Sequence, residues 1–184
     1  MGDERVLRML AMSGSLRHVS SNTALLRTAV QLAPVGVELS VYAELGTIPP
    51  FNPDLDTDAP PAAVSRFRAA LQASDALLIS SPEYAHGVSG VLKNALDSVV
   101  GSGELIDKPI ALINASAHAT HAHASLRETL TTMSGHVVEN ASITIPFAAA
   151  ALDADGTLRD ARVAASLTSV IEALADAIRA RQTV

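Results

Sequence analysis

The chain has 184 residues, of which 48% are hydrophobic, 17% are charged and 3% are aromatic, and its formal net charge is −6. No apolar stretch approaches the roughly 20 residues that cross a bilayer, and residues 3–5 do not resemble a secretion signal, so we expect a cytoplasmic protein with no membrane partner. The negative charge argues against nucleic-acid binding, and the absence of cysteine excludes disulfides, thiolate nucleophiles and cysteine-ligated metal sites.

Five short aliphatic runs alternate with helical patterns, which is typical of a doubly wound α/β sheet. The length fits a single domain over residues 1–184. The expected strands are residues 6–12, 38–42, 76–80, 109–114 and 137–145. The expected helices are residues 23–33, 61–73, 88–100, 125–133 and 159–181. Residues 47–61 contain five prolines and are expected to form a surface loop, either a flap or a contact region.

The first predicted strand runs directly into a polar turn at the start of the first predicted helix. This first loop, residues 13–22, combines Gly14 and Arg17 with several hydroxyl side chains and one carboxamide. Donors at a helix N-terminus can surround a phosphate group, and the helix dipole favours its negative charge. Ser20, Ser21 and Asn22 could instead simply cap the helix, but capping does not need Arg17. The first loop therefore predicts a phosphorylated cofactor.

A second distinctive loop, residues 81–89, follows the third predicted strand and contains Pro82-Glu83-Tyr84. In an open parallel sheet, ligands bind beyond the carboxyl ends of the strands, where the winding direction reverses. For the strand order 2-1-3-4-5, that position lies between the first and third strands. Because the first and second loops follow those two strands, we expect them to bind the same ligand.

The two loops together resemble the NAD(P)H-dependent FMN reductase family, in order and spacing, over about residues 6–147. The matching motifs are Gly14-Ser15-Leu16-Arg17-x-x-Ser20-x-Asn22, Pro82-Glu83-Tyr84 and Gly90-x-Leu92-Lys93-Asn94-x-x-Asp97. The resemblance implies a flavodoxin-like, doubly wound, five-stranded parallel sheet of order 2-1-3-4-5 with helices on both faces. It also implies that NAD(P)H reduces bound FMN, which then passes electrons to a small acceptor: a quinone, azo compound, metal oxyanion, free flavin or oxygen.

The family's cofactor contacts map onto residues of the first and second loops. The implied phosphate contacts are Ser15, the backbone of Leu16, Arg17, Ser20 and Asn22. The implied contacts to the flavin ring are Pro82, Glu83 and Tyr84, and we also expect the cofactor to contact Ala85, His86, Ser116 and His118. No catalytic side chain is expected, because the flavin carries the chemistry. We expect Glu83 to cap a helix or organise the backbone rather than act as a general acid, and Lys93 and Asp97 to pair on one helix face.

The chain departs from the family pattern near the expected ring site. Ala85 and Ser89 stand where the family usually has Asn and Pro. A third loop, residues 114–123, carries Ala, Ser and His where the family commonly uses glycines that let the backbone approach the ring. We expect His118 or His121 to lie beside the flavin, where an imidazole would stabilise the reduced ring and raise its reduction potential.

Other functions remain open from the sequence. The spacing His118-x-x-His121-x-His123 is compatible with a metal site. Together with Glu83 it would suit a metal-dependent hydrolase. Because the sequence around these histidines has no acidic ligand, we expect no bound metal. Exposed histidines without a role are a further alternative. A non-enzymatic electron carrier or a flavin-binding sensor would use the same fold. The resemblance also implies a homodimer or homotetramer, with residues 47–61 as a possible interface element.

Overall fold

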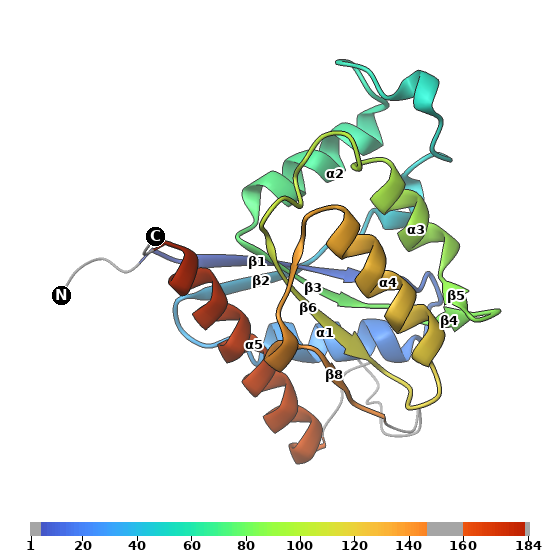
Figure 1. Ribbon diagram of the computed structural model, residues 1–184. Helices are drawn as coiled ribbons and strands as arrows, with labels where there is room; N and C mark the ends of the chain where they lie inside the picture. Colours follow the sequence, from blue (N-terminus) through green and yellow to red (C-terminus); the bar gives the residue numbers. More distant parts are fainter. Residues whose placement is uncertain (1–4, 147–159, 183–184) are drawn as a thin grey trace.

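The computed structural model describes residues 5–146 and 160–182. Within them, the main sheet has six strands, all paired in parallel, in the order β2-β1-β3-β6-β7, with β8 also pairing with β6 (Figure 1). These strands are β1 (Leu7–Ser13), β2 (Val37–Val41), β3 (Ala76–Ser80), β6 (Pro109–Asn114), β7 (His136–Val137) and β8 (Ile143–Thr144). A separate antiparallel hairpin joins β4 (Glu83–Tyr84) to β5 (Gly87–Val88). The flavodoxin-like class and the predicted strand order are confirmed.

Helices cover both faces of the sheet, as Figure 1 shows. The α-helices are α1 (Ser21–Gln31), α2 (Ala62–Ala73), α3 (Gly90–Asp97), α4 (Thr120–Thr132) and α5 (Ala161–Gln182). Short 3-10 turns are η1 (Leu45–Thr47), η2 (Pro53–Leu55) and η3 (Glu139–Ala141). In the described part of the chain, no helix is both long and apolar enough to cross a membrane.

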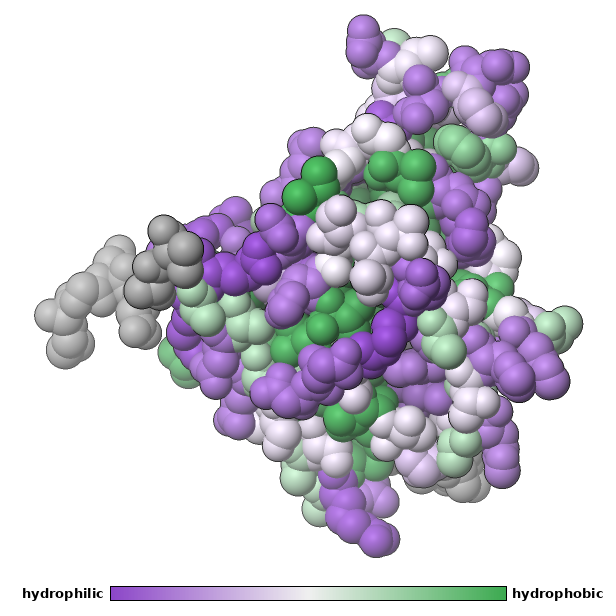
Figure 2. Space-filling model, in the orientation of Figure 1, coloured by the Kyte–Doolittle hydropathy of each residue, from purple (hydrophilic) through white to green (hydrophobic). Residues whose placement is uncertain are grey.

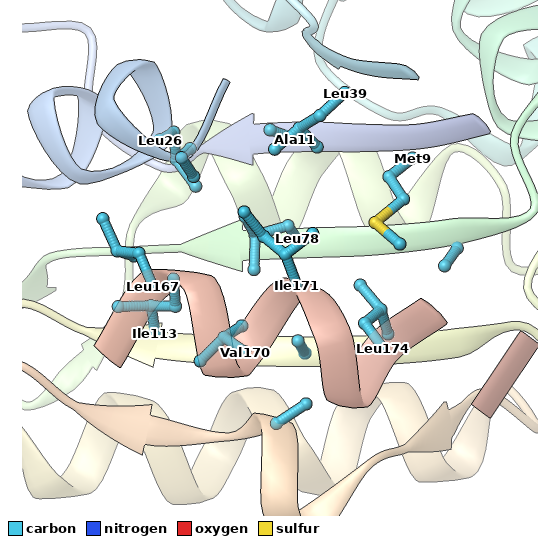
Figure 3. Packing of buried hydrophobic residues seen from close by; sticks show 14 of the residues in the cluster. Met9, Ala11, Leu26, Leu39, Leu78, Ile113, Leu167, Val170, Ile171 and Leu174 are labelled. Atoms are coloured by element: carbon cyan, nitrogen blue, oxygen red, sulfur yellow. The ribbon is translucent and has the colours of Figure 1, made fainter. Parts of the chain in front are cut away.

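The two faces of β1 explain how the layers pack. Met9 and Ala11 point into the cluster that α1 and α5 cover, which Figure 3 shows, whereas Leu10 and Met12 point toward α2, α3 and α4. Successive side chains of a strand alternate between faces, so a strand covered on both sides must be apolar throughout. This is why β3 and β6, with every residue buried, read as continuous apolar runs in the sequence.

Three predicted elements differ from those in the structure by more than two residues at an end or by a break. The expected strand 137–145 is divided into β7, η3 and β8, and at the break Ser142 Oγ accepts a hydrogen bond from Leu112 N–H (3.2 Å) in place of a ladder bond. The expected helix 88–100 is shortened to α3, because residue 88 belongs to β5 and residues 98–100 form a turn. Helix α4 begins five residues earlier than predicted, so His121 and His123 lie in a helix and not in a loop. Residue 159, the expected start of the last helix, lies outside the described residues.

The proline-rich segment 47–61 lies on the surface, as predicted, and is fastened to α2 and α3. Asn94 Oδ1 accepts from Phe51 N–H (2.7 Å), and its Nδ2 donates to the carbonyl of Pro49 (2.9 Å). Arg68 bridges the carboxylate of Asp56 (2.7 Å) and the carbonyl of Ser98 (2.9 Å). The part of this segment around η2 projects at the top of Figure 1, and Figure 2 shows its tip as hydrophilic.

Candidate functional site

The candidate site is built at the carboxyl ends of three neighbouring strands. Strands β1, β3 and β6 each end in a polar residue that is nearly enclosed: Ser13 is 8% exposed, Ser80 0% and Asn114 6%. The first, second and third loops follow these residues, and Ser13 and Ser80 are neighbours in the sheet register. The three loops therefore meet at one edge of the sheet.

The first loop is held by hydroxyl groups. Ser20 is the N-cap of α1, and its Oγ accepts from Thr23 N–H (3.3 Å), so the predicted capping role is real for this residue. The hydroxyls of Ser13 and Thr23 bond to each other at 2.8 Å, which ties the end of β1 to the first turn of α1. Ser13 Oγ also accepts from Ser15 N–H (3.2 Å), and Ser15 Oγ accepts from Arg17 N–H (3.3 Å).

Capping leaves several donors of the first loop unused. The backbone N–H groups of Ser21 and Asn22 lie in the first turn of α1, where an α-helix offers no internal partner. Asn22 Oδ1 accepts from the buried Ser80 Oγ (2.8 Å), while its Nδ2 has no partner among the described residues. The Arg17 side chain is exposed and makes no hydrogen bond or ion pair with any described residue. This set of cationic and neutral donors at a helix N-terminus suits a phosphate group.

Gly14 permits the first and second loops to approach closely. A Cβ at this position would lie 2.4 Å from Ser81 Oγ and 2.8 Å from Ser89 Oγ. The backbone N–H of Gly14 donates to the carbonyl of Ser80 (2.9 Å), so the close approach continues the β1–β3 pairing beyond the last ladder residues. Any larger residue would push the two loops apart.

The second loop folds into the β4–β5 hairpin and contacts the start of α4. The turn residues Ala85 and His86 both have positive φ, 49° and 59°, as type I′ hairpin turns require. Glu83 Oε2 accepts from Ala122 N–H (2.8 Å), and the rings of His86 and His121 stack at 4.3 Å with 6° between their planes. Glu83 thus takes the predicted capping role.

Asn114 shapes the third loop. Its Nδ2 donates to the carbonyl of Ala119 (2.9 Å), its Oδ1 accepts from Ser116 N–H (3.0 Å), and Ser116 Oγ accepts from His118 N–H (3.2 Å). A loop that lacks glycine is folded here by a buried carboxamide that bonds to its backbone at both ends.

A cavity of about 310 Å³ opens between the start of α1 and the second and third loops. Its lining comprises Asn22, Ser81, Pro82, Glu83, Asn114, Ala115, Ser116, His118 and Ala119. Of the predicted cofactor contacts, it includes Asn22, Pro82, Glu83, Ser116 and His118. The remaining predicted contacts lie outside the lining. Ser15, Leu16, Arg17 and Ser20 form the first loop beside it, and Tyr84, Ala85 and His86 lie along the exposed hairpin.

The histidines of the third loop and α4 have separate environments. His118 lines the cavity and His121 stacks on His86, whereas His123 is half-buried and its Nε2 has no hydrogen-bond partner among the described residues. Burial, and to a smaller extent the charge of Arg127, lowers the pKa of His123 below its ordinary value. Across residues 5–146 and 160–182, no group of three or more potential ligands is arranged to hold a metal ion.

Sequence reasoning did not single out four residues that organise the site: Ser13, Thr23, Ser80 and Asn114. Their hydrogen bonds fix the first loop, the Asn22 side chain and the third loop. Three of them could have been found from the sequence. Ser13, Ser80 and Asn114 each directly follow several apolar residues, at the carboxyl end of a buried strand. A nearly enclosed polar group at that position needs a partner, and here the partners lie in the first turn of α1 and in the third loop.

Comparisons with known proteins agree with this geometry. Residues 7–150 match the family described as NADPH-dependent FMN reductase. The chain is 36% identical, over 173 residues, to an NAD(P)H-dependent FMN reductase of Pseudomonas aeruginosa, covering 91% of this chain and 93% of that one. It is 33% identical, over 162 residues, to a quinone reductase of Pseudomonas putida, covering 85% and 87%.

Among solved structures, the chain is similar to FerB, a flavoenzyme NAD(P)H:(acceptor) oxidoreductase from Paracoccus denitrificans. The TM-score is 0.83 at 31% identity, over 95% of this chain and 98% of that one. A WrbA-like flavodoxin from Agrobacterium tumefaciens, with a TM-score of 0.56 and 16% identity over 96% and 98% of the two chains, shares the fold.

Proposed function

The chain belongs to the NADPH-dependent FMN reductase family, and on that premise we propose that it uses NAD(P)H and bound FMN to reduce small acceptors, quinones foremost. Relatives named as reductases favour an enzyme over the electron-carrier alternative. The structural observation that best supports the proposal is the set of unused donors in the first loop, next to a cavity between the second and third loops.

The phosphate of FMN would be held by the first loop. Arg17 supplies positive charge, and the N–H groups of Ser21 and Asn22 add donors at the positive end of the α1 dipole. We assign further contacts to the hydroxyls of Ser15 and Ser20, the backbone of Leu16 and the Asn22 side chain. Since most of these groups are already fixed by hydrogen bonds or helix geometry, binding requires little ordering of the chain.

The flavin ring would lie against the second and third loops. We assign Pro82, Glu83, Ser116 and His118 to its immediate surroundings, with Tyr84, Ala85 and His86 at the exposed rim. When bound, FMN would supply the redox chemistry that connects NAD(P)H with the acceptor. The carboxylate of Glu83 already accepts from Ala122 N–H, so its role is to hold the loop and not to transfer a proton. We assign the stabilisation of the reduced ring to the imidazole of His118, because this residue lines the cavity.

An anaerobic two-step titration tests the proposed function. The FMN-loaded protein should lose its visible flavin absorbance when NADH or NADPH is added, and regain it when a quinone is added. Free FMN at the same concentration is the control for reduction in solution. A protein that binds FMN but is not reduced faster than free FMN would contradict the enzymatic proposal and favour a carrier or sensor.

We further propose a cytoplasmic homodimer or homotetramer whose whole length forms one FMN-binding domain. The cysteine-free composition requires no oxidising compartment. Segment 47–61 exposes Phe51 and Leu55 while hydrogen bonds from Asn94 hold it in place, which suits a preformed contact surface. Light scattering of the purified protein should give two or four times the 19.0 kDa mass of one chain. A single-chain mass would contradict this assembly.

A further inference from the structure

The β4–β5 hairpin carries predicted ring contacts but has no place in the main sheet. It consists of two strands of two residues each, and an isolated hairpin of this size is not stable in water by itself. The position of Pro82, Glu83 and Tyr84 must therefore be fixed by whatever the hairpin packs against. That element is the first turn of α4.

Two contacts join the hairpin to α4, and they involve adjacent residues of the helix. Glu83 Oε2 accepts from Ala122 N–H at 2.8 Å, and the ring of His86 stacks on that of His121 at 4.3 Å and 6°. The N-cap position of α4 is Ala119, whose side chain cannot accept a hydrogen bond. The second loop thus supplies the cap that α4 lacks, while α4 supplies the surface on which the hairpin rests.

These contacts bear on the shape of the cavity. Pro82 and Glu83 line it from the second loop, and His118 and Ala119 line it from the third loop immediately before α4. A displacement of the hairpin relative to α4 would change the separation of those two walls.

We propose that the His86–His121 stack, together with the Glu83–Ala122 hydrogen bond, sets the width of the slot that receives the flavin ring. His86 and His121 are then positioning residues, acting through the two loops rather than by proton transfer. The inference rests on the proposed function for its ligand, but the stack itself can be tested in the protein without FMN. It also gives a reason for imidazoles at the exposed rim of the site.

The test uses variants that distinguish the effect of ring stacking from the effects of imidazole ionisation and of the backbone turn. His86→Asn removes one ring but keeps a residue that tolerates positive φ. His121→Ala removes the other ring, and His121→Phe keeps a flat ring that can stack without imidazole nitrogens. His136→Asn, at an exposed imidazole of β7, is the matched control. The full-length proteins are compared by FMN titration and, without FMN, by hydrogen exchange at the amides of residues 83–88.

We expect His86→Asn and His121→Ala each to weaken FMN binding by about three- to tenfold, in line with the strength of aromatic pairs. The double variant should be little worse than either single variant, because each removes the same contact. His121→Phe should restore most of the affinity, and hydrogen exchange in the hairpin should follow the same order. His136→Asn should behave as the unmodified protein.

The proposal is overturned if His121→Phe is as weak as His121→Ala, or if the two single effects simply multiply in the double variant. It is also overturned if FMN binds equally well to all variants. If the unmodified protein does not bind FMN, the proposed function fails. The role of the stack in holding the hairpin is then tested by hydrogen exchange alone. Unchanged protection in His86→Asn and His121→Ala would contradict that role.

Discussion

The phosphate end and the ring end of the candidate site are built differently. At the phosphate end, Ser13, Ser15, Ser20 and Asn22 are each no more than 8% exposed and are tied by hydrogen bonds to the sheet or to α1. At the ring end, the exposed hairpin lies outside the main sheet and is held by its contacts with α4. In the proposed binding mode, the phosphate of FMN therefore meets a preformed anchor and the ring meets a more adjustable slot, which suits an enzyme that must admit two substrates to one flavin.

The largest effect is expected where the two ends meet, at Gly14. In Gly14→Ala the new Cβ would lie 2.9 Å from Ser81 Cβ as well as close to two hydroxyls, so the first and second loops must separate. We expect the free energy of unfolding to fall by about 1–3 kcal/mol, as for other overpacked sites, and FMN affinity to fall at least about tenfold. Urea denaturation and FMN titration measure the two effects.

Gly90→Ala is the matched control, because no atom other than those of the flanking residues and the nearby backbone of α3 lies within 4 Å of the Cβ position at Gly90. It should leave FMN affinity close to that of the unmodified protein and should not lower the free energy of unfolding, since alanine favours a helix more than glycine does. If the two alanine variants behave alike, close approach of the first and second loops is not what Gly14 provides.

An intermediate effect is expected for His123, which should make the free energy of unfolding depend on pH. The pKa of His123 in α4 is lowered by burial, so below about pH 6.5, the usual histidine value, the unfolded chain binds a proton that the folded chain does not. Acidification through this range should therefore lower the free energy of unfolding, and this contribution should be absent above it. Urea denaturation of the unmodified protein and of His123→Leu, between about pH 7.5 and 5, compares the slopes.

His123→Leu should show the shallower slope, because the buried imidazole is gone. Arg127→Ala should give a smaller reduction, since the charge of Arg127 contributes less than burial to the lowered pKa. Equal slopes in all three proteins would show that His123 is not responsible for acid sensitivity in this region.

The smallest effect is expected in the hairpin turn. Ala85 has φ of 49°, a conformation that glycine adopts without the penalty of a side chain. Ala85→Gly should raise the free energy of unfolding by about 0.5–1 kcal/mol, whereas Ala124→Gly, in the exposed part of α4, should lower it by about 1 kcal/mol. Urea denaturation should therefore give changes of opposite sign in the free energy of unfolding for the two Ala→Gly variants. If both variants were less stable than the unmodified protein, the turn at Ala85 would not be strained.

The same contrast explains how far the sequence alone predicts the molecule. Strands β3 and β6 were predicted with the bounds that the structure has, because burial on both faces leaves an unbroken apolar run. The capping role of Ser20 was also visible, since a cap is a local feature. The start of α4 is not visible in the sequence, because its cap is Glu83, which lies 39 residues away from the Ala122 that it caps. Hydroxyl pairs such as Ser13–Thr23, and the stack of His86 on His121, likewise depend on tertiary contacts that periodicity does not encode.

The most direct test of the phosphate anchor compares FMN with riboflavin, which has the same ring but no phosphate. The unmodified apoprotein should bind one FMN per chain, and riboflavin much more weakly. Arg17→Ala should lose about ten- to hundredfold in FMN affinity, as expected for charged hydrogen bonds, with riboflavin binding unchanged. Equal affinities for FMN and riboflavin in the unmodified protein would contradict a phosphate site in the first loop.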